Sequence, residues 1–310
     1  MERFFLKLKY ILYSLRPKQW IKNLLVYSFL FFDKELFNVH DFIIVTETFF
    51  VLIILSSSVY LINDLVDLNR DKVHPIKRKR ALAAGKITQR ESIIISLILF
   101  SIGFFLSILI SEYLAVIYIF YYILMILYSL YLKNIIIIDA LTTATGFVLR
   151  AIAGGVVIAT PINSWLIIFI TCGSLFVAFA KRRAEVVNLS FKNAIIHRSV
   201  LKSYPKELLD NLISLTGAVT FFSYILFSYN EDLNTKTPVI LSHLLPLHLK
   251  NPHWVKFSIP LVFYIIARYI YDIYVKKEGG EPENIIYEDK ALMIPGIIYI
   301  ALLFTILYVI

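Results

Sequence analysis

Apolar runs of about 20 residues recur along this chain, and short polar segments separate them. A backbone in hydrocarbon must satisfy its own hydrogen bonds, and the runs lack the alternating pattern of barrel strands, so each run is predicted to be a helix. We therefore predict an all-α, polytopic membrane protein with about nine transmembrane helices. The expected spans cover approximately 17–32, 42–62, 92–110, 113–132, 135–158, 163–180, 211–230, 257–275 and 292–310.

The composition agrees with a membrane protein, because 59% of the residues are hydrophobic, whereas soluble domains contain about 45 to 50%. The net charge of +9 is compatible with nucleic acid, lipid headgroups or phosphorylated substrates as partners. The charges cluster between the apolar runs, which favours the lipid bilayer and phosphorylated substrates, and no nucleic-acid partner is expected. Residues 1–310 are predicted to form a single transmembrane domain, and a homo-oligomer is compatible with it.

The basic residues indicate the orientation of the chain. They concentrate in alternate connections, which the positive-inside rule assigns to the cytoplasm. The predicted cytoplasmic polar segments lie near 63–90, 133–134, 181–209 and 276–290. We therefore expect a multi-pass protein of the cell (inner) membrane, with its N-terminus and its active site on the cytoplasmic side.

A carboxylate motif follows the second apolar run. Asn63, Asp67 and Asp71 are spaced by four residues, so a continuing helix would place their oxygen atoms on one face, with Asp64 beside them. Such hard oxygen ligands suit Mg²⁺, which takes one or two carboxylates together with substrate phosphates and water. A cationic segment at 77–80 comes next, and this combination indicates a metal-bound diphosphate. The alternative is that the aspartates only form ion pairs with neighbouring Arg and Lys side chains.

The second half of the chain contains a charge inside a predicted span. Arg150 lies well within 135–158, where an isolated charge costs about 3 kcal/mol or more, so it is expected to need an anion. Asp139 precedes it by about three helical turns, and the two side chains are therefore expected to face the same cavity.

The motif Asn63-Asp64-x-x-Asp67-x-x-x-Asp71 resembles the first aspartate-rich motif of the UbiA superfamily of intramembrane prenyltransferases. This resemblance implies nine transmembrane helices around a central cavity and Mg²⁺ as the cofactor. This chain departs from the second acidic motif of the superfamily, because Thr143 stands where a second aspartate would follow Asp139. A second metal held by two carboxylates is therefore not expected.

Four further features narrow the resemblance to one branch of the superfamily. They are the segment 15–23, the pair Tyr128 and Lys133 with Arg150, and the segments 181–185 and 279–283. The branch transfers the 5-phosphoribosyl group of phosphoribosyl pyrophosphate to a polyprenyl (decaprenyl-type) phosphate and releases diphosphate. The resemblance thus implies a Mg-dependent membrane phosphoribosyltransferase that makes precursors of cell-envelope glycans.

The resemblance also implies roles for individual residues. The expected metal ligands are Asn63, Asp67 and Asp71, and the expected catalytic residues are Asp67, Asp71, Lys133, Asp139 and Arg150. The expected substrate-binding residues are Lys18, Trp20, Lys22, Asp64, Lys77, Arg78, Tyr128, Lys133, Arg150, Arg182 and Arg183, and Glu281 and Glu283 are expected near the ribose. Lys18, Trp20 and Lys22 are assigned to the lipid phosphate at the interface.

Two other functions are compatible with parts of the sequence. A prenyltransferase would move an isoprenoid from its diphosphate to an aromatic or quinone-precursor acceptor, with nearly the same metal chemistry. A membrane transporter would use Arg150 and Asp139 as a substrate relay, but no internal repeat of broken helices is evident.

Overall fold

The long helices are apolar toward the outside and small or polar toward their neighbours. In α5 (Gln89–Ile110), the buried residues are Ser92, Ser96, Gly103 and Ser107, whereas Phe105 and Leu109 are more than half exposed. This arrangement is the reverse of a soluble amphipathic helix. It is typical of membrane helices, in which small residues allow close packing and apolar side chains face lipid.

The structure is a computed structural model that describes residues 2–75, 77–188, 199–229, 254–276 and 289–309. Within these ranges the regular elements are all helices, which confirms the all-α prediction. Eight helices are long and apolar enough to cross a membrane, close to the predicted nine. They are Val39–Val66, Gln89–Ile110, Glu112–Leu130, Ile138–Val157, Ser164–Val187, Lys206–Ser228, Trp254–Val275 and Lys290–Val309.

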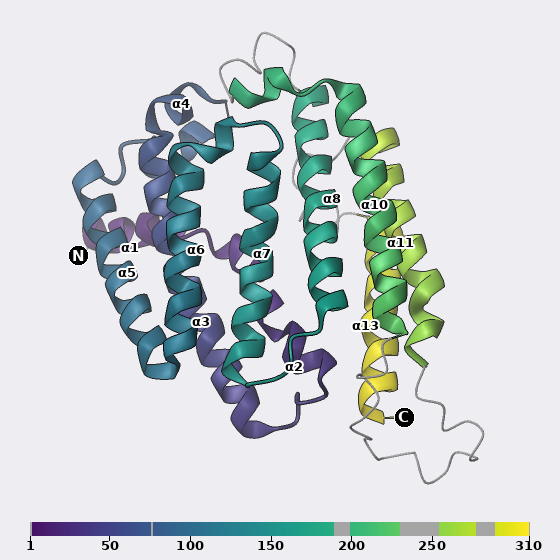
Figure 1. The fold of residues 1–310 in the computed structure, drawn as a ribbon. Coiled ribbons are helices and arrows are strands. Elements are labelled where there is room, and N and C mark those ends of the chain that lie inside the picture. The colour runs from purple at the N-terminus through teal and green to yellow at the C-terminus, as the bar shows by residue number, and fades with distance from the viewer. Residues whose placement is uncertain (1, 76, 189–198, 230–253, 277–288, 310) are drawn as a thin grey trace. The chain divides into compact units, whose positions relative to one another are not determined.

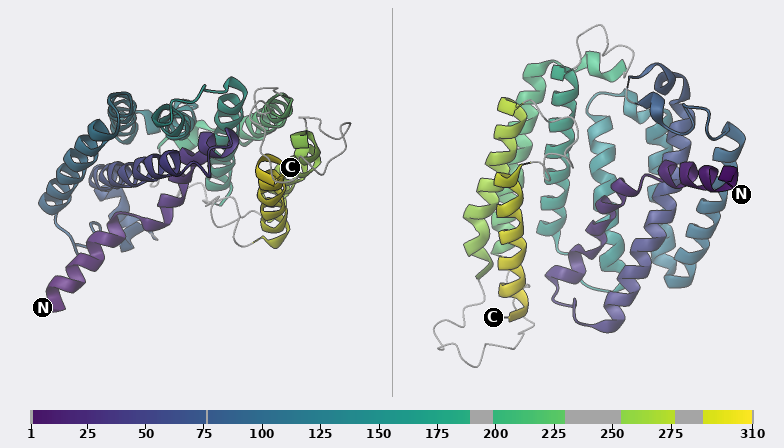
Figure 2. Two further views of the ribbon diagram at one scale, coloured as in Figure 1. Left: turned by 90° about the horizontal axis from the view of Figure 1, so that it is seen from below. Right: turned by 180° about the vertical axis from the view of Figure 1, so that it is seen from behind.

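The segment 17–32, expected as the first span, consists of two shorter helices. It forms the 3₁₀ helix η1 (Pro17–Tyr27) and the short α2 (Ser28–Phe32). It follows the amphipathic helix α1 (Glu2–Ser14), which crosses the direction of the long helices at a steep angle (Figure 2).

The chain divides into two units, which are described separately. The first comprises Met1–Phe31, Glu35–Ile162 and Lys192–Ser203, and the second comprises Phe32–Lys34, Asn163–Phe191 and Tyr204–Ile310. In the first unit, α3 (Val39–Val66) packs against α5, α6 (Glu112–Leu130) and α7 (Ile138–Val157), and these helices run side by side (Figure 1).

The interface of α3 with α5 is polar in its centre. Ser58 donates to the carbonyl of Ser96 at 2.8 Å, and Ser96 donates to the carbonyl of Ser58 at 3.1 Å. Gly103 lies against Leu55, so closely that a Cβ atom there would come within 2.8 Å of that side chain. Mutual hydrogen bonds and a missing side chain thus hold α3 in a fixed position, from which its last turn carries the carboxylate motif.

The polar segments of the first unit gather at one end of its long helices. α4 (Leu68–Val73) and the 3₁₀ helix η2 (Lys77–Lys79) follow the end of α3, and η3 (Leu132–Asn134) connects α6 to α7 at the same end (Figure 1). The sequence segments 63–90 and 133–134, which were predicted to lie on one side of the membrane, are therefore neighbours. Which side of the membrane they face stays a prediction.

η1 packs directly against α7 at a glycine pair. A Cβ atom at Gly154 would lie 1.8 Å from the carbonyl oxygen of Val26, and one at Gly155 would lie 3.0 Å from the ring of Phe29. Backbone therefore meets backbone at Gly154. Because η1 has three residues per turn, Asn23 lies on the same face as Val26 and is directed toward α7 as well.

The second unit contains α8 (Ser164–Asn188), α10 (Lys206–Ser228), α11 (Ile259–Tyr271) and α13 (Lys290–Phe304). α10 packs against α8 and α11, and α11 packs against α13. The motif 279–283, with Glu281 and Glu283, lies outside the described residues.

Candidate active site

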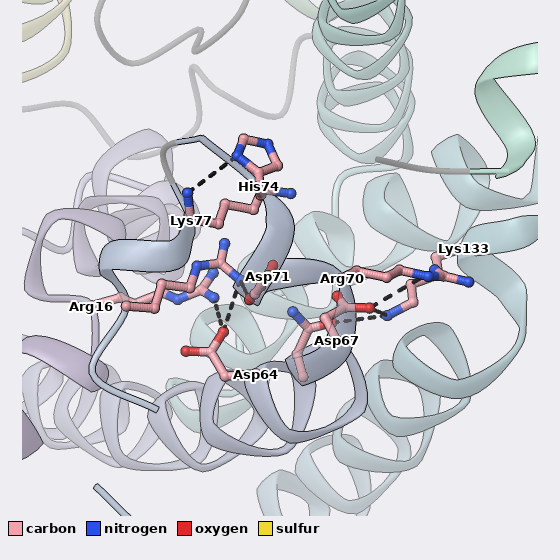
Figure 3. A network of polar contacts seen from close by, with 10 residues as sticks. Arg16, Asp64, Asp67, Arg70, Asp71, His74, Lys77 and Lys133 are labelled. Carbon is pink, nitrogen blue, oxygen red and sulfur yellow. Dashed lines mark hydrogen bonds and ion pairs between the residues drawn. The ribbon is translucent and has the colours of Figure 1, made fainter. Parts of the chain in front are cut away.

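The carboxylate motif lies where α3 ends and α4 begins. α3 ends at Val66, Asp67 follows with φ −90° and ψ 2°, and α4 starts at Leu68. On one continuous helix, Asn63, Asp67 and Asp71 would share a face, as the sequence predicts. In the structure the helix is interrupted at Asp67, and the carboxylates of the motif form two groups with different partners (Figure 3).

The first group consists of two aspartates and two arginines. Arg80 donates through one nitrogen to Oδ1 of Asp64 at 3.0 Å and to Oδ2 of Asp71 at 2.6 Å. Arg16 donates to the same oxygen of Asp64. Burial raises the pKa of Asp71, and the adjacent Arg80 opposes this effect by stabilising the carboxylate. Asp64 and Asp71 are therefore both ion-paired with arginine.

Arg16 reaches Asp64 from an unusual backbone conformation. Its φ of 56° and ψ of 62° are left-handed, and Pro17 follows it. Such a conformation is costly for a residue other than glycine and persists only where its surroundings hold it. The carbonyl of Leu15 accepts hydrogen bonds from Trp20 Nε1 at 3.1 Å and from Ser57 Oγ at 3.3 Å. Both bonds fix the turn that directs Arg16 toward the carboxylates.

The second group joins the end of α3 to η3. Lys133, which is buried, donates to Oδ1 of Asp67 at 2.7 Å and lies 3.5 Å from Oδ1 of Asn63. Arg70 is 4.0 Å from the same oxygen of Asp67. Residues 70 positions apart in the sequence are thus brought together, as the predicted site requires (Figure 3).

The donor atoms of this second group fit a magnesium ion. Within the described ranges, His, Cys, Asp and Glu form no cluster of three or more that could hold a metal. Mg²⁺ needs only one or two carboxylates when substrate phosphates complete its coordination. The side chain of Asp67 is 19% exposed, and its Oδ1 takes the ion pair with Lys133, so Oδ2 suits this role. The amide oxygen of Asn63, which accepts from Lys133 at 3.5 Å, would have to share that donor with the metal. Asp71, which is bound to Arg80, would have to exchange that partner to join them.

The cationic segment after α4 borders the first group. Nδ1 of His74 accepts a hydrogen bond from the backbone N–H of Lys77 at 3.2 Å, which shapes the start of η2. Lys77 is half-buried, and Arg78 is exposed. Both predicted phosphate-binding residues are therefore next to the carboxylate motif along the chain.

The predicted lipid-phosphate residues lie on η1, and its geometry separates them. In a 3₁₀ helix, residues four apart point about 120° away from each other. Lys18 is on the exposed face and Lys22 is half-buried on another. Trp20 donates to the carbonyl of Leu15 and thereby anchors the turn. Their predicted role in binding the lipid phosphate stays a prediction.

Arg150 is buried in α7, about 18 Å along the helix from its start at Ile138. Its Nε donates to Oδ1 of Asn23 at 3.0 Å, and its two terminal nitrogens donate to the carbonyl of Gly146 at 2.7 Å and to the hydroxyl of Tyr121 at 2.9 Å. All three acceptors are neutral. The anion that the sequence predicts for Arg150 is not among its hydrogen-bond partners in the described part of the chain.

Two further predicted residues of the first unit lie on helices next to η3. Asp139 is fully buried in the first turn of α7, three turns before Arg150. Tyr128 is half-buried in the last turn of α6. Their predicted roles in catalysis and substrate binding stay predictions.

Arg182 and Arg183 lie in the second unit, on α8. Arg182 pairs with Glu185 at 2.5 Å. Arg183 pairs with Asp210 of α10 at 2.5 Å, and its guanidinium lies 3.9 Å from the ring centre of Tyr274. These contacts connect three helical segments, so Arg183 contributes to the packing of this unit. The predicted contact of either arginine with a substrate phosphate stays a prediction.

Four residues that the structure places in these groups were not predicted from the sequence. Arg16 and Arg80 bind the aspartates, and Asn23 and Tyr121 bind Arg150. Arg16 and Asn23 belong to the polar segment 15–23, and Arg80 ends the cationic segment 77–80, so their residue types were a usable signal. Tyr121 is one of many aromatic residues in the spans, and its sequence context does not distinguish it.

Comparisons with known proteins show what this chain is similar to. The model of the UbiA prenyltransferase family matches residues 35–192. The decaprenyl-phosphate phosphoribosyltransferase of Mycolicibacterium smegmatis is 31% identical over 290 residues, which cover 91% of this chain and 87% of that protein. The enzyme of the same name from Corynebacterium glutamicum is 30% identical, over 93% of this chain and 83% of that protein.

Solved structures show the same fold. A UbiA homologue from Archaeoglobus fulgidus, bound to GPP and Mg²⁺, has a TM-score of 0.68 and 17% identity, with 96% of this chain and 99% of that chain covered. The apo structure of a UbiA homologue from Aeropyrum pernix has a TM-score of 0.62 and 13% identity, with 94% of this chain and 98% of that chain covered.

Proposed function

Because this chain belongs to the UbiA prenyltransferase family, we propose that it is a Mg-dependent membrane phosphoribosyltransferase. It transfers the 5-phosphoribosyl group of phosphoribosyl pyrophosphate to a polyprenyl phosphate, decaprenyl phosphate or a similar lipid, and releases diphosphate. The observation that carries the proposal is the similarity to decaprenyl-phosphate phosphoribosyltransferases over 91% and 93% of this chain. The product would serve as a precursor of cell-envelope glycans.

The reaction requires little acid–base chemistry. An oxygen of the lipid phosphate attacks C1 of the ribose, the bond from C1 to the diphosphate breaks, and diphosphate leaves with the electron pair. The lipid phosphate is already anionic near neutral pH, so no side chain has to remove a proton. Positioning of the two substrates and stabilisation of the charge on the leaving group therefore supply most of the acceleration.

Asn63 and Asp67 are the residues that we assign to Mg²⁺, and Asp71 would be a third ligand if its carboxylate left Arg80. The bound ion would neutralise charge on the departing diphosphate. Lys133 holds Asp67 in position through its ion pair at 2.7 Å. Lys77 and Arg78 follow the motif directly and attract the phosphate oxygens, with the active site on the cytoplasmic side.

The two alternative functions have less support. A prenyl transfer to an aromatic acceptor would use the same carboxylates, and the Archaeoglobus neighbours were solved with GPP or DMAPP, but at 17% identity they indicate only the fold. The relatives that match over most of this chain carry the name of the phosphoribosyltransferase. The transporter interpretation has no support from these similarities.

A direct assay tests the proposed activity. Purified protein in detergent or vesicles is expected to convert labelled phosphoribosyl pyrophosphate and polyprenyl phosphate into a labelled lipid when Mg²⁺ is present, and chelation is expected to stop the reaction because the leaving group would then lack its counter-charge. Chromatography of the extracted lipid measures the product. If the protein instead moved a prenyl group to an aromatic acid and formed no ribosylated lipid, the prenyltransferase alternative would be correct.

The double change Lys18→Gln with Lys22→Gln is expected to raise the apparent KM for polyprenyl phosphate more than that for phosphoribosyl pyrophosphate. Each lost charge-assisted contact weakens binding about tenfold to hundredfold. Steady-state kinetics with each substrate varied in turn measure the effect. Because η1 directs the two lysines differently, each single variant shows which lysine contributes. An equal loss for both substrates would make these lysines a general attractor of anions.

A further inference from the structure

Arg150 retains its full charge in the interior of the first unit. Arg150 is only 6% exposed, and an arginine side chain stays protonated in proteins. Its partners are an amide oxygen, a backbone carbonyl and a hydroxyl, and the rings of Tyr121 and Phe147 lie 5.0 and 5.2 Å away. These groups satisfy hydrogen bonds and solvate the cation, but none of them neutralises it.

The guanidinium also keeps donor capacity. Of its five N–H groups, three are used by Asn23, Gly146 and Tyr121. The described residues offer no acceptor to the other two, both on the terminal nitrogens. Two such N–H groups match the oxygens of a phosphate, and a buried guanidinium is well suited to planar, bidentate binding of this kind.

Asn23 is itself held in one orientation. Its amide nitrogen donates to Oγ of Ser56 at 3.3 Å, and Ser56 donates to the carbonyl of Ile53 at 3.2 Å. Because the hydroxyl proton of Ser56 is used in this way, Ser56 accepts from the amide group of Asn23, so the amide oxygen of Asn23 must face Arg150. Helix α3, the 3₁₀ helix η1 and helix α7 are thereby joined through one chain of hydrogen bonds.

We propose that Asn23 and Tyr121 are positioning residues, which hold Arg150 as a charged binding site for a phosphate group of one substrate. The proposal rests on the proposed function for the identity of the substrates. A neutral acceptor is essential to it, since a carboxylate in the place of Asn23 would keep Arg150 in position and cancel its charge. The phosphate could come from the polyprenyl phosphate or from phosphoribosyl pyrophosphate, which share this chemistry.

The variant Asn23→Asp tests this idea because it preserves the acceptor oxygen and adds a negative charge. The affinity for one of the two phosphate substrates is expected to fall about tenfold to hundredfold, which is the usual size of a charge-assisted contact. Binding is measured without turnover, from the rise in the unfolding temperature as each substrate is added separately to the full-length protein. The substrate that the variant binds more weakly is the one that Arg150 contacts, and the KM for this substrate is expected to rise by a similar factor.

Two further variants separate positioning from stability. Tyr121→Phe keeps the ring over the guanidinium and removes only the acceptor oxygen. It is therefore expected to lower the affinity for the same substrate, by a smaller factor than Asn23→Asp does. Ser56→Ala removes the bond to Asn23 without adding a charge, and its effect is expected to stay below that of Asn23→Asp.

The proposal is overturned if Asn23→Asp binds both substrates as tightly as the unchanged protein, since Asn23 would then serve only in packing. It is also overturned if the ligand-free variant unfolds at a lower temperature and its affinities for both substrates fall only as much as this loss of stability explains. Failure of the proposed function is distinguishable from these results. In that case the unchanged protein forms no ribosylated lipid, while the binding comparison, repeated with inorganic diphosphate, still reports on Arg150.

Discussion

Asp67→Asn is expected to lower turnover on the order of a thousandfold, equivalent to about 4 kcal/mol in the activation barrier. The substitution removes the charge of the most exposed carboxylate of the motif and its ion pair with Lys133. The leaving diphosphate would lose metal-assisted stabilisation, and the buried Lys133 would lose its counter-charge. Initial rates with saturating substrates measure the loss, and the titration of Mg²⁺ shows whether metal affinity falls with it.

Asp41→Asn is a matched control on α3, the helix that ends just before Asp67. Asp41 lies in the first turn of α3, at the opposite end from Asp67, where its Oδ2 accepts from Asn38 at 2.8 Å. The same chemical change there is expected to leave turnover close to that of the unchanged protein. Full activity of Asp67→Asn in a folded, membrane-inserted protein would remove this carboxylate from the mechanism.

Gly154→Ala is expected to destabilise the first unit by about 3 kcal/mol, at the upper end of the usual cost of overpacking. The added Cβ would lie 1.8 Å from the carbonyl oxygen of Val26, and no rotamer change can relieve a contact with backbone. η1 must therefore move away from α7, which would pull Asn23 from Arg150. A lower unfolding temperature together with weaker substrate binding measures both effects.

Gly173→Ala and Gly296→Ala are controls for this substitution. A Cβ atom at Gly173 would meet Thr220 at an ordinary contact distance of 3.6 Å, and one at Gly296 would meet nothing within 4 Å. Both glycines lie in membrane-spanning helices, as Gly154 does. If Gly154→Ala were as stable as these two variants, η1 and α7 would not be in backbone contact at Gly154.

The sequence alone determined the class of fold and the chemistry of the motif. Apolar runs of this length have only one way to satisfy their backbone in lipid, so the helices at 92–110 and 113–132 could be predicted within a few residues. The residue types of the carboxylate motif and of the cationic segment 77–80 similarly indicated phosphate chemistry. Such inferences depend on composition and spacing, which are local properties.

The tertiary structure decided which side chains meet. Spacing by four predicted one carboxylate face, but Arg80 pairs with Asp71, whereas Lys133 pairs with Asp67. The 3₁₀ form of η1 separated Lys18 from Lys22 and directed Asn23 toward Arg150 instead. These outcomes depend on packing between segments that are distant in the sequence, such as the backbone contact at Gly154. Local periodicity contains no information about such contacts.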